Sequence, residues 1–173
     1  MKIISGLALG VMGLALMAAA VPAFAANTCY TAEQMEAEQL LRLHSELMVI
    51  TVTCRQGSQG EALPAAYGDF THRNIRMLHD AEQTMIAYFR DNQSGDPVEH
   101  LDRLRTILAN EFGQKSATMT APEFCTAYRD KVLAYDAATS ADVLNEVERM
   151  KLAERSYAPP CAGSHTVMAK KGG

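Results

Sequence analysis

The apolar residues in segment 29–54 recur at alternating steps of three and four positions. The stripe consists of Leu40, Leu43, Leu47 and Ile50, and it is widened by Leu41, Met48 and Val52. Because an α-helix turns by about 100° per residue, this spacing predicts one long amphipathic helix bounded by Cys29 and Cys54. We expect the opposite side to face solvent; its polar residues are Glu38, Arg42, Ser45 and Glu46.

A second long helix is expected from Pro64 to Asn92. The polar, glycine-bearing segment 55–60 must end the first helix, and Pro64 suits the first turn of the next. The apolar residues of this second segment fall on one broad face, so it also has a side to bury. We expect the first two helices to be the longest in the chain.

Three further helices are predicted from their start signals. Asp96-Pro97-Val98-Glu99 and Thr120-Ala121-Pro122-Glu123 each combine a capping side chain, a proline in the first turn and a glutamate that can return a hydrogen bond. The first of these helices is expected to end at Gly113. The last helix is expected to start with Ser140 as its cap and to carry Val143, Val147, Met150 and Tyr157.

The fold class follows from these periodicities. No segment shows a sustained alternation of β-branched and polar residues, and the connections are short. We therefore predict an all-α protein, a disulfide-stapled bundle of about five amphipathic helices in a single domain, residues 27–161.

The N-terminal segment 1–26 has the pattern of a cleaved signal peptide. Lys2 precedes an apolar run, and the run ends in Ala23-Phe24-Ala25, a typical cleavage site. The alternative is an uncleaved membrane anchor, but glycines interrupt the run. We expect a soluble mature protein in the periplasm or secreted, with no membrane span after cleavage. Its last segment, 162–173, is predicted to be a disordered tail.

The charge distribution argues against two classes of partner. The formal net charge is −4, and the 16 basic residues are scattered along the chain. Nucleic acids and anionic membrane surfaces require concentrated lysine and arginine, so we expect the protein to bind neither.

The four cysteines predict two disulfides in an exported protein. If segment 29–54 is helical, its ends lie roughly 35 Å apart, whereas bridged α-carbons lie within about 7 Å. Up-and-down packing brings Cys54 to the same end of the molecule as Cys125, which leaves Cys29 for Cys161. The second pair fits a simple bundle less well, so the crossed pairing stays open, and a four-thiolate metal site is the rival interpretation.

Candidate chemistry centres on His44, which the helical spacing places near the middle of the apolar side. A buried polar site is predicted here, because Glu82 projects close to the apolar face of the second helix and needs a partner, either His44 or an arginine. Met48 and Met85 are candidate neighbours, and His44 and His79 are weak candidates for metal ligands. The alternative function is therefore a bundle that binds haem or a transition metal such as copper.

No catalytic motif accompanies these residues. The chain contains no His-Glu-x-x-His, no Gly-x-Ser-x-Gly and no glycine-rich phosphate loop. We therefore favour a non-enzymatic protein of the bacterial envelope without a cofactor, which interacts with another envelope protein or a small ligand. An enzyme without a recognisable motif, with a pocket joining His44 and Glu82, is the third possibility.

Overall fold

The computed structural model describes residues 29–56, 61–153 and 156–162. Within these ranges the chain forms six helices: α1 (Ala32–Cys54), α2 (Ala62–Arg73), α3 (Ile75–Asn92), α4 (Pro97–Ala117), α5 (Ala121–Asp136) and α6 (Ser140–Ala153). The predicted all-α class is confirmed. The predicted signal peptide, and the predicted tail beyond Ala162, lie outside the described residues.

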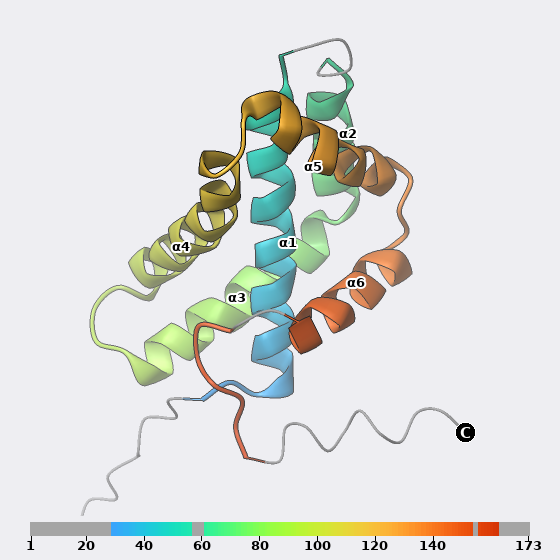
Figure 1. Cartoon of the computed structure of the whole chain (residues 1–173). Coiled ribbons are helices and arrows are strands. Elements are labelled where there is room, and N and C mark those ends of the chain that lie inside the picture. The colour runs from blue at the N-terminus through green and yellow to red at the C-terminus, as the bar shows by residue number, and fades with distance from the viewer. Residues whose placement is uncertain (1–28, 57–60, 154–155, 163–173) are drawn as a thin grey trace, which may run out of the picture.

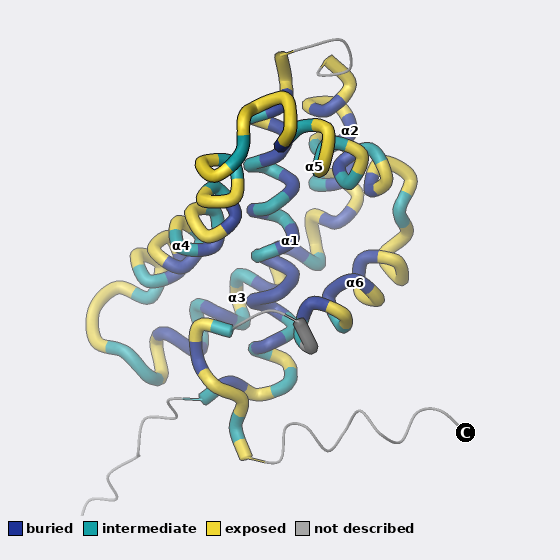
Figure 2. The backbone as a smooth tube through the Cα atoms, viewed as in Figure 1, coloured by how far each residue is buried: buried dark blue, intermediate teal, exposed yellow. Residues whose placement is uncertain are grey.

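Helix α1 is the central element of the fold. It contacts each of the other helices, which surround it on several sides (Figure 1). Its apolar stripe is core, since Leu43, Leu47 and Ile50 are fully buried. Buried positions follow α1 along its length, whereas α4 and α6 keep exposed outer faces (Figure 2).

The prediction of a solvated side on α1 is wrong. Glu38 is 0% exposed and Ser45 is 3% exposed, while the side chains of Arg42 and Glu46 are only 11% and 12% exposed. Val52, predicted on the apolar stripe, is instead 63% exposed. The reason is that helices pack on more sides of α1 than its apolar stripe covers. Ion pairs and hydrogen bonds compensate the burial of these four polar side chains.

Local capping chemistry sets several helix starts. Thr31 and Gln34 form a reciprocal capping box, so α1 begins at Ala32, three residues after Cys29. The predicted Thr120 box with Glu123 is present, and Asp96 caps α4 by accepting from the Val98 N–H at 2.8 Å. The last cap is corrected by one residue: Thr139 and Asp142 exchange the capping bonds, and Ser140 is already helical.

The predicted second helix is interrupted at Asn74. This buried side chain donates its Nδ2–H to the Phe70 carbonyl at 2.8 Å, the same carbonyl that accepts its backbone N–H at 3.1 Å. Asparagine competes in this way with regular helical bonding, and here the chain divides into α2 and α3. Among the helices that the structure describes, the second longest is consequently α4, with 21 residues.

Two helix ends also differ from the predictions. Helix α4 continues through Gly113 to Ala117, so that glycine does not end it. Helix α6 ends at Ala153, and Tyr157 belongs to the segment that follows. That segment, residues 156–162, is called the C-terminal strap below.

The disulfide pairing agrees with the prediction. Cys54 is joined to Cys125 with α-carbons 5.4 Å apart, and Cys29 is joined to Cys161 with α-carbons 4.8 Å apart. The second pair is possible because α5 crosses the end of the molecule and α6 then runs back toward the start of α1 (Figure 1).

The C-terminal strap is held by more than its disulfide. The Tyr30 N–H donates to the Pro159 carbonyl at 2.7 Å, and the Cys161 N–H donates to the Tyr30 carbonyl at 2.8 Å. The Tyr157 N–H donates to the Glu38 carboxylate at 2.8 Å. Burial raises the pKa of Glu38, although this hydrogen bond and Arg42 favour its charged form.

None of the helices in the described ranges has the length and apolar content needed to cross a membrane.

Candidate functional site

The candidate site is a groove between α1 and α4 with a volume of about 350 Å³. Its lining from α1 is His44, Ser45 and Met48, and its lining from α4 is Asp102, Arg105, Thr106, Ala109 and Asn110. We call this the His44 groove. It presents two apolar side chains, Met48 and Ala109, beside charged and hydrogen-bonding groups.

His44 lies half-buried against α2. Its Nε2 is 2.8 Å from the Tyr67 hydroxyl and 3.5 Å from Thr71 Oγ1. The imidazole and phenol rings are stacked, with centroids 5.4 Å apart. These contacts fix the ring orientation and commit one ring nitrogen, so a ligand in the groove could meet only the other nitrogen.

The charge state of His44 follows from its surroundings. Burial, and to a smaller extent the nearby positive charge of Arg105, lower its pKa to about 4. The imidazole is therefore neutral near pH 7. It offers a hydrogen-bonding group to the site without adding a positive charge.

The structure gives the predicted interior carboxylate a different partner from His44. Arg105 Nη1 donates to Glu82 Oε1 at 2.8 Å, so the ion pair connects α3 and α4 beside the groove. The side chain of Glu82 is 28% exposed and that of Arg105 is 39% exposed. Pairing at this exposure contributes little stability. Its effect is to hold the guanidinium at the edge of the groove.

The other candidate metal ligands, Met48, Met85 and His79, do not lie together. Met48 lines the groove with His44. Met85 is fully buried in the hydrophobic core, and His79 is exposed on α3. Among the residues that the structure describes, no three or more His, Cys, Asp or Glu side chains are grouped to hold a metal ion.

The contribution of α4 was missed in the sequence analysis. Asp102, Thr106 and Asn110 recur at four-residue steps, so they form one polar row on the helix. On sequence alone this row resembles an ordinary solvated face. Only the position of α4 beside His44 makes it one wall of a groove.

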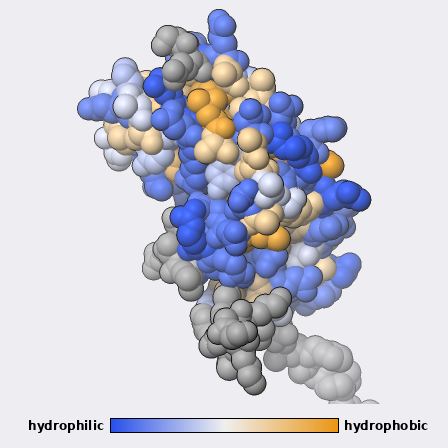
Figure 3. Space-filling view, turned by 90° about the vertical axis from the view of Figure 1, so that its right-hand side faces the viewer, coloured by the Kyte–Doolittle hydropathy of each residue, from blue (hydrophilic) through white to orange (hydrophobic). Residues whose placement is uncertain are grey.

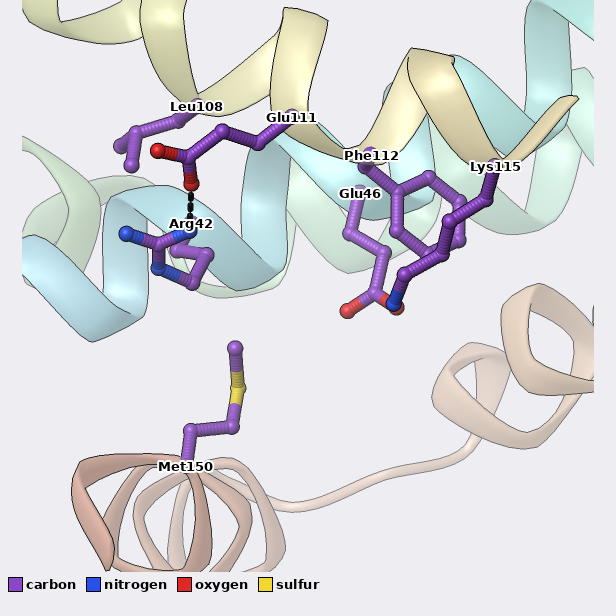
Figure 4. A pocket seen from close by; sticks show the side chains of 7 residues that line it. All are labelled: Arg42, Glu46, Leu108, Glu111, Phe112, Lys115 and Met150. Atoms are coloured by element: carbon purple, nitrogen blue, oxygen red, sulfur yellow. Dashed lines mark hydrogen bonds and ion pairs between the residues drawn. The ribbon is translucent and has the colours of Figure 1, made fainter. Parts of the chain in front are cut away.

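A smaller cavity of about 80 Å³ lies between α1, α4 and α6. Arg42 pairs with Glu111 across it, Lys115 lies 4.8 Å from the centroid of the Phe112 ring, and Met150 enters from α6 (Figure 4). Glu46, which also lines it, accepts from Lys131 at 2.7 Å. Because positive and negative groups alternate and pair around this cavity, we interpret it as polar packing between helices.

Comparison with protein-family models, curated proteins and solved structures found no match to this chain, so the His44 groove is interpreted from its own geometry.

Proposed function

We propose that this chain is an exported, non-enzymatic protein of the bacterial envelope that binds a small polar ligand in the His44 groove. One observation carries the proposal: the groove brings a neutral, oriented imidazole together with a polar row of α4 around about 350 Å³ of open volume. That volume suits a molecule of metabolite size.

The groove chemistry indicates the kind of ligand. Within the described residues the exposed Asp102 carboxylate has no ion-pair partner, and the groove edge carries the Arg105 guanidinium. Met48 and Ala109 supply a short apolar surface between polar groups. A zwitterion of amino-acid or dipeptide size would place its ammonium near Asp102 and its carboxylate near Arg105.

Export is supported by the signal-like segment 1–26 and by the two disulfides, which form and persist in oxidising compartments. The proposed location is the periplasm or the cell exterior.

The hydrogen bonds of the groove hydroxyl groups favour a binding role over catalysis. The Ser45 hydroxyl donates to the Leu41 carbonyl of its own helix at 2.8 Å, and Thr106 donates to the Asp102 carbonyl at 2.9 Å. His44 is bonded to Tyr67 rather than to either hydroxyl. Nucleophilic catalysis needs a hydroxyl that is bonded to its base, and these contacts direct the groove hydroxyls elsewhere.

The test is a thermal-shift screen of amino acids, dipeptides, polyamines and sugars, followed by calorimetry of the hits. A ligand that binds only the native state must raise the melting temperature. Ala109→Trp fills the groove and should abolish the shift. Ala65→Trp, at an exposed position of α2, is the matched control and should retain it. A ligand that stabilises both variants equally would place binding elsewhere, and a screen without hits would refute the proposal.

Binding of haem or copper is the second candidate function, and one observation favours it: His44 and Met48 line the same groove. Nitrogen and thioether ligands suit copper(I). The test for copper(I) is competition with a chromophoric copper(I) chelator, and the test for haem is a direct absorbance titration; both are followed by measurement of the melting temperature. Met48→Leu should weaken copper binding if the groove is the site, and binding unchanged in Met48→Leu would exclude Met48 as a ligand.

A further inference from the structure

A second groove of about 290 Å³ lies between α1, α3 and α6, away from α4. Its floor is apolar and consists of Ala37, Leu40, Met77, Ala81 and Leu144. Its rim carries three carboxylates, Glu33, Glu36 and Asp80. We call it the acidic groove.

The floor of the acidic groove exposes apolar surface. Leu144 is 38% exposed, although Val143 and Val147 on the same helix are fully buried. Met77 is half-buried beside the core. The side of the molecule on which α6 lies shows apolar patches enclosed by hydrophilic side chains (Figure 3). An apolar patch with a polar border is typical of a surface that a partner covers.

The rim has an excess of negative charge. Within the described residues Glu33 and Asp80 are exposed and have no ion-pair partner. Glu36 lies 3.8 Å from Lys151, but that lysine also contacts Glu148 at 2.5 Å. One cation is thus shared by two carboxylates, and its side chain is only 4% exposed. An incoming molecule meets acidic groups rather than the lysine.

From this charge and shape we propose that the acidic groove docks a cationic amphipathic helix of a partner protein. One apolar side chain of the partner covers Leu144 and Met77, while neighbouring lysine or arginine side chains reach the carboxylates of the rim. A helix can present both kinds of group together, because positions three and four apart lie on one face. The volume accommodates an anchoring side chain rather than a folded surface.

The negative rim excludes other classes of partner. The carboxylates would repel nucleic acids and anionic membranes, because the phosphate groups of both also carry negative charge. A small inorganic cation would leave the apolar floor uncovered. A cationic segment with an apolar stripe satisfies both features of the groove.

The test uses fluorescence anisotropy with a labelled amphipathic peptide of leucine and lysine, about 14 residues long and so about four helical turns. A peptide with glutamate in place of lysine is the charge control. The wild-type protein should bind the leucine-lysine peptide and not the leucine-glutamate peptide. Glu33→Lys/Asp80→Lys should weaken binding by about tenfold or more, because like charges then face each other.

Two further variants separate docking from general charge attraction. Asp91→Lys/Asp130→Lys changes the net charge equally, at exposed positions of α3 and α5, and should retain the wild-type affinity. Leu144→Gln leaves the charge unchanged and should also weaken binding. Equal loss in the two lysine variants, normal binding by Leu144→Gln or no binding by wild type would each overturn the proposal. Circular dichroism of each variant checks that the helices are retained.

Discussion

Replacing His44 by glutamine should make the protein less sensitive to acid. The imidazole has a folded-state pKa of about 4, against an ordinary value of 6.5, because it is buried and close to Arg105. Between these two values the unfolded chain binds a proton that the folded protein excludes. As far as His44 is concerned, the free energy of unfolding is therefore highest above about pH 6.5 and falls as the pH is lowered toward 4.

The size of the effect follows from this interval. A difference of one pKa unit corresponds to about 1.4 kcal/mol, so the whole interval from 6.5 to about 4 is worth about 3 kcal/mol. Between pH 7 and pH 5 the wild-type protein should lose about 2 kcal/mol through His44. Burial raises the pKa of Glu38, which acts in the opposite direction, but Glu38 is present in both proteins and cancels in the comparison.

The assay is urea unfolding at several pH values between 7 and 5, followed by circular dichroism. The difference in unfolding free energy between wild type and His44→Gln should change by about 2 kcal/mol across this range. His79→Gln, at an exposed position of α3, controls for the loss of an imidazole from the chain. Parallel pH curves for wild type and His44→Gln would refute the burial of His44 described above.

Three further predictions concern the core and the strap. Glu38→Ala should cost about 2 to 3 kcal/mol, because it removes one of the two carboxylates paired with Arg42 and the acceptor of the Tyr157 N–H. Glu38→Gln keeps an acceptor and should cost less, and equal costs in chemical denaturation would contradict this. Replacing Cys54 and Cys125 by serine opens a loop with a sequence separation of 71 and should lower the unfolding free energy by about 4 kcal/mol. Urea unfolding under non-reducing conditions measures this loss, and an unchanged midpoint would contradict the bridge. Leu47→Ala should lower the unfolding free energy by about 2 to 5 kcal/mol because the side chain is fully buried, and a neutral result in the same assay would place it outside the core.

Local chemistry explains which parts of the fold could be predicted from the sequence. The capping box of Thr120 and Glu123 depends on residues three apart, so it is readable without tertiary information. The disulfide pairing was limited by the length of one helix, which makes a bridge between Cys29 and Cys54 impossible.

Tertiary packing explains what could not be predicted. Glu38 and Ser45 have the polarity of surface residues, and their burial depends on which helices cover α1. The break at Asn74 depends on a buried side-chain bond to Phe70 that competes with regular helical pairing. Apolar periodicity reports the most hydrophobic side of a helix, not the number of sides that other helices cover.

In the candidate site, too, the features that depend on local spacing were predictable and those that depend on tertiary packing were not. His44 was identified as a polar group on an apolar side, and the choice of an arginine as the partner of Glu82 was among the alternatives. Tyr67 and the polar row of α4 were not identified, because both depend on the placement of helices distant in sequence.

Native mass spectrometry would test the central claim, ligand binding in the His44 groove, most directly. The wild-type protein, Ala109→Trp and Ala65→Trp would each be incubated with a mixture of polar metabolites and transferred to volatile buffer. We predict a small-molecule adduct on the wild type and on Ala65→Trp that is absent from Ala109→Trp. An adduct of the same mass and occupancy on Ala109→Trp, or no adduct on the wild type, would contradict the claim.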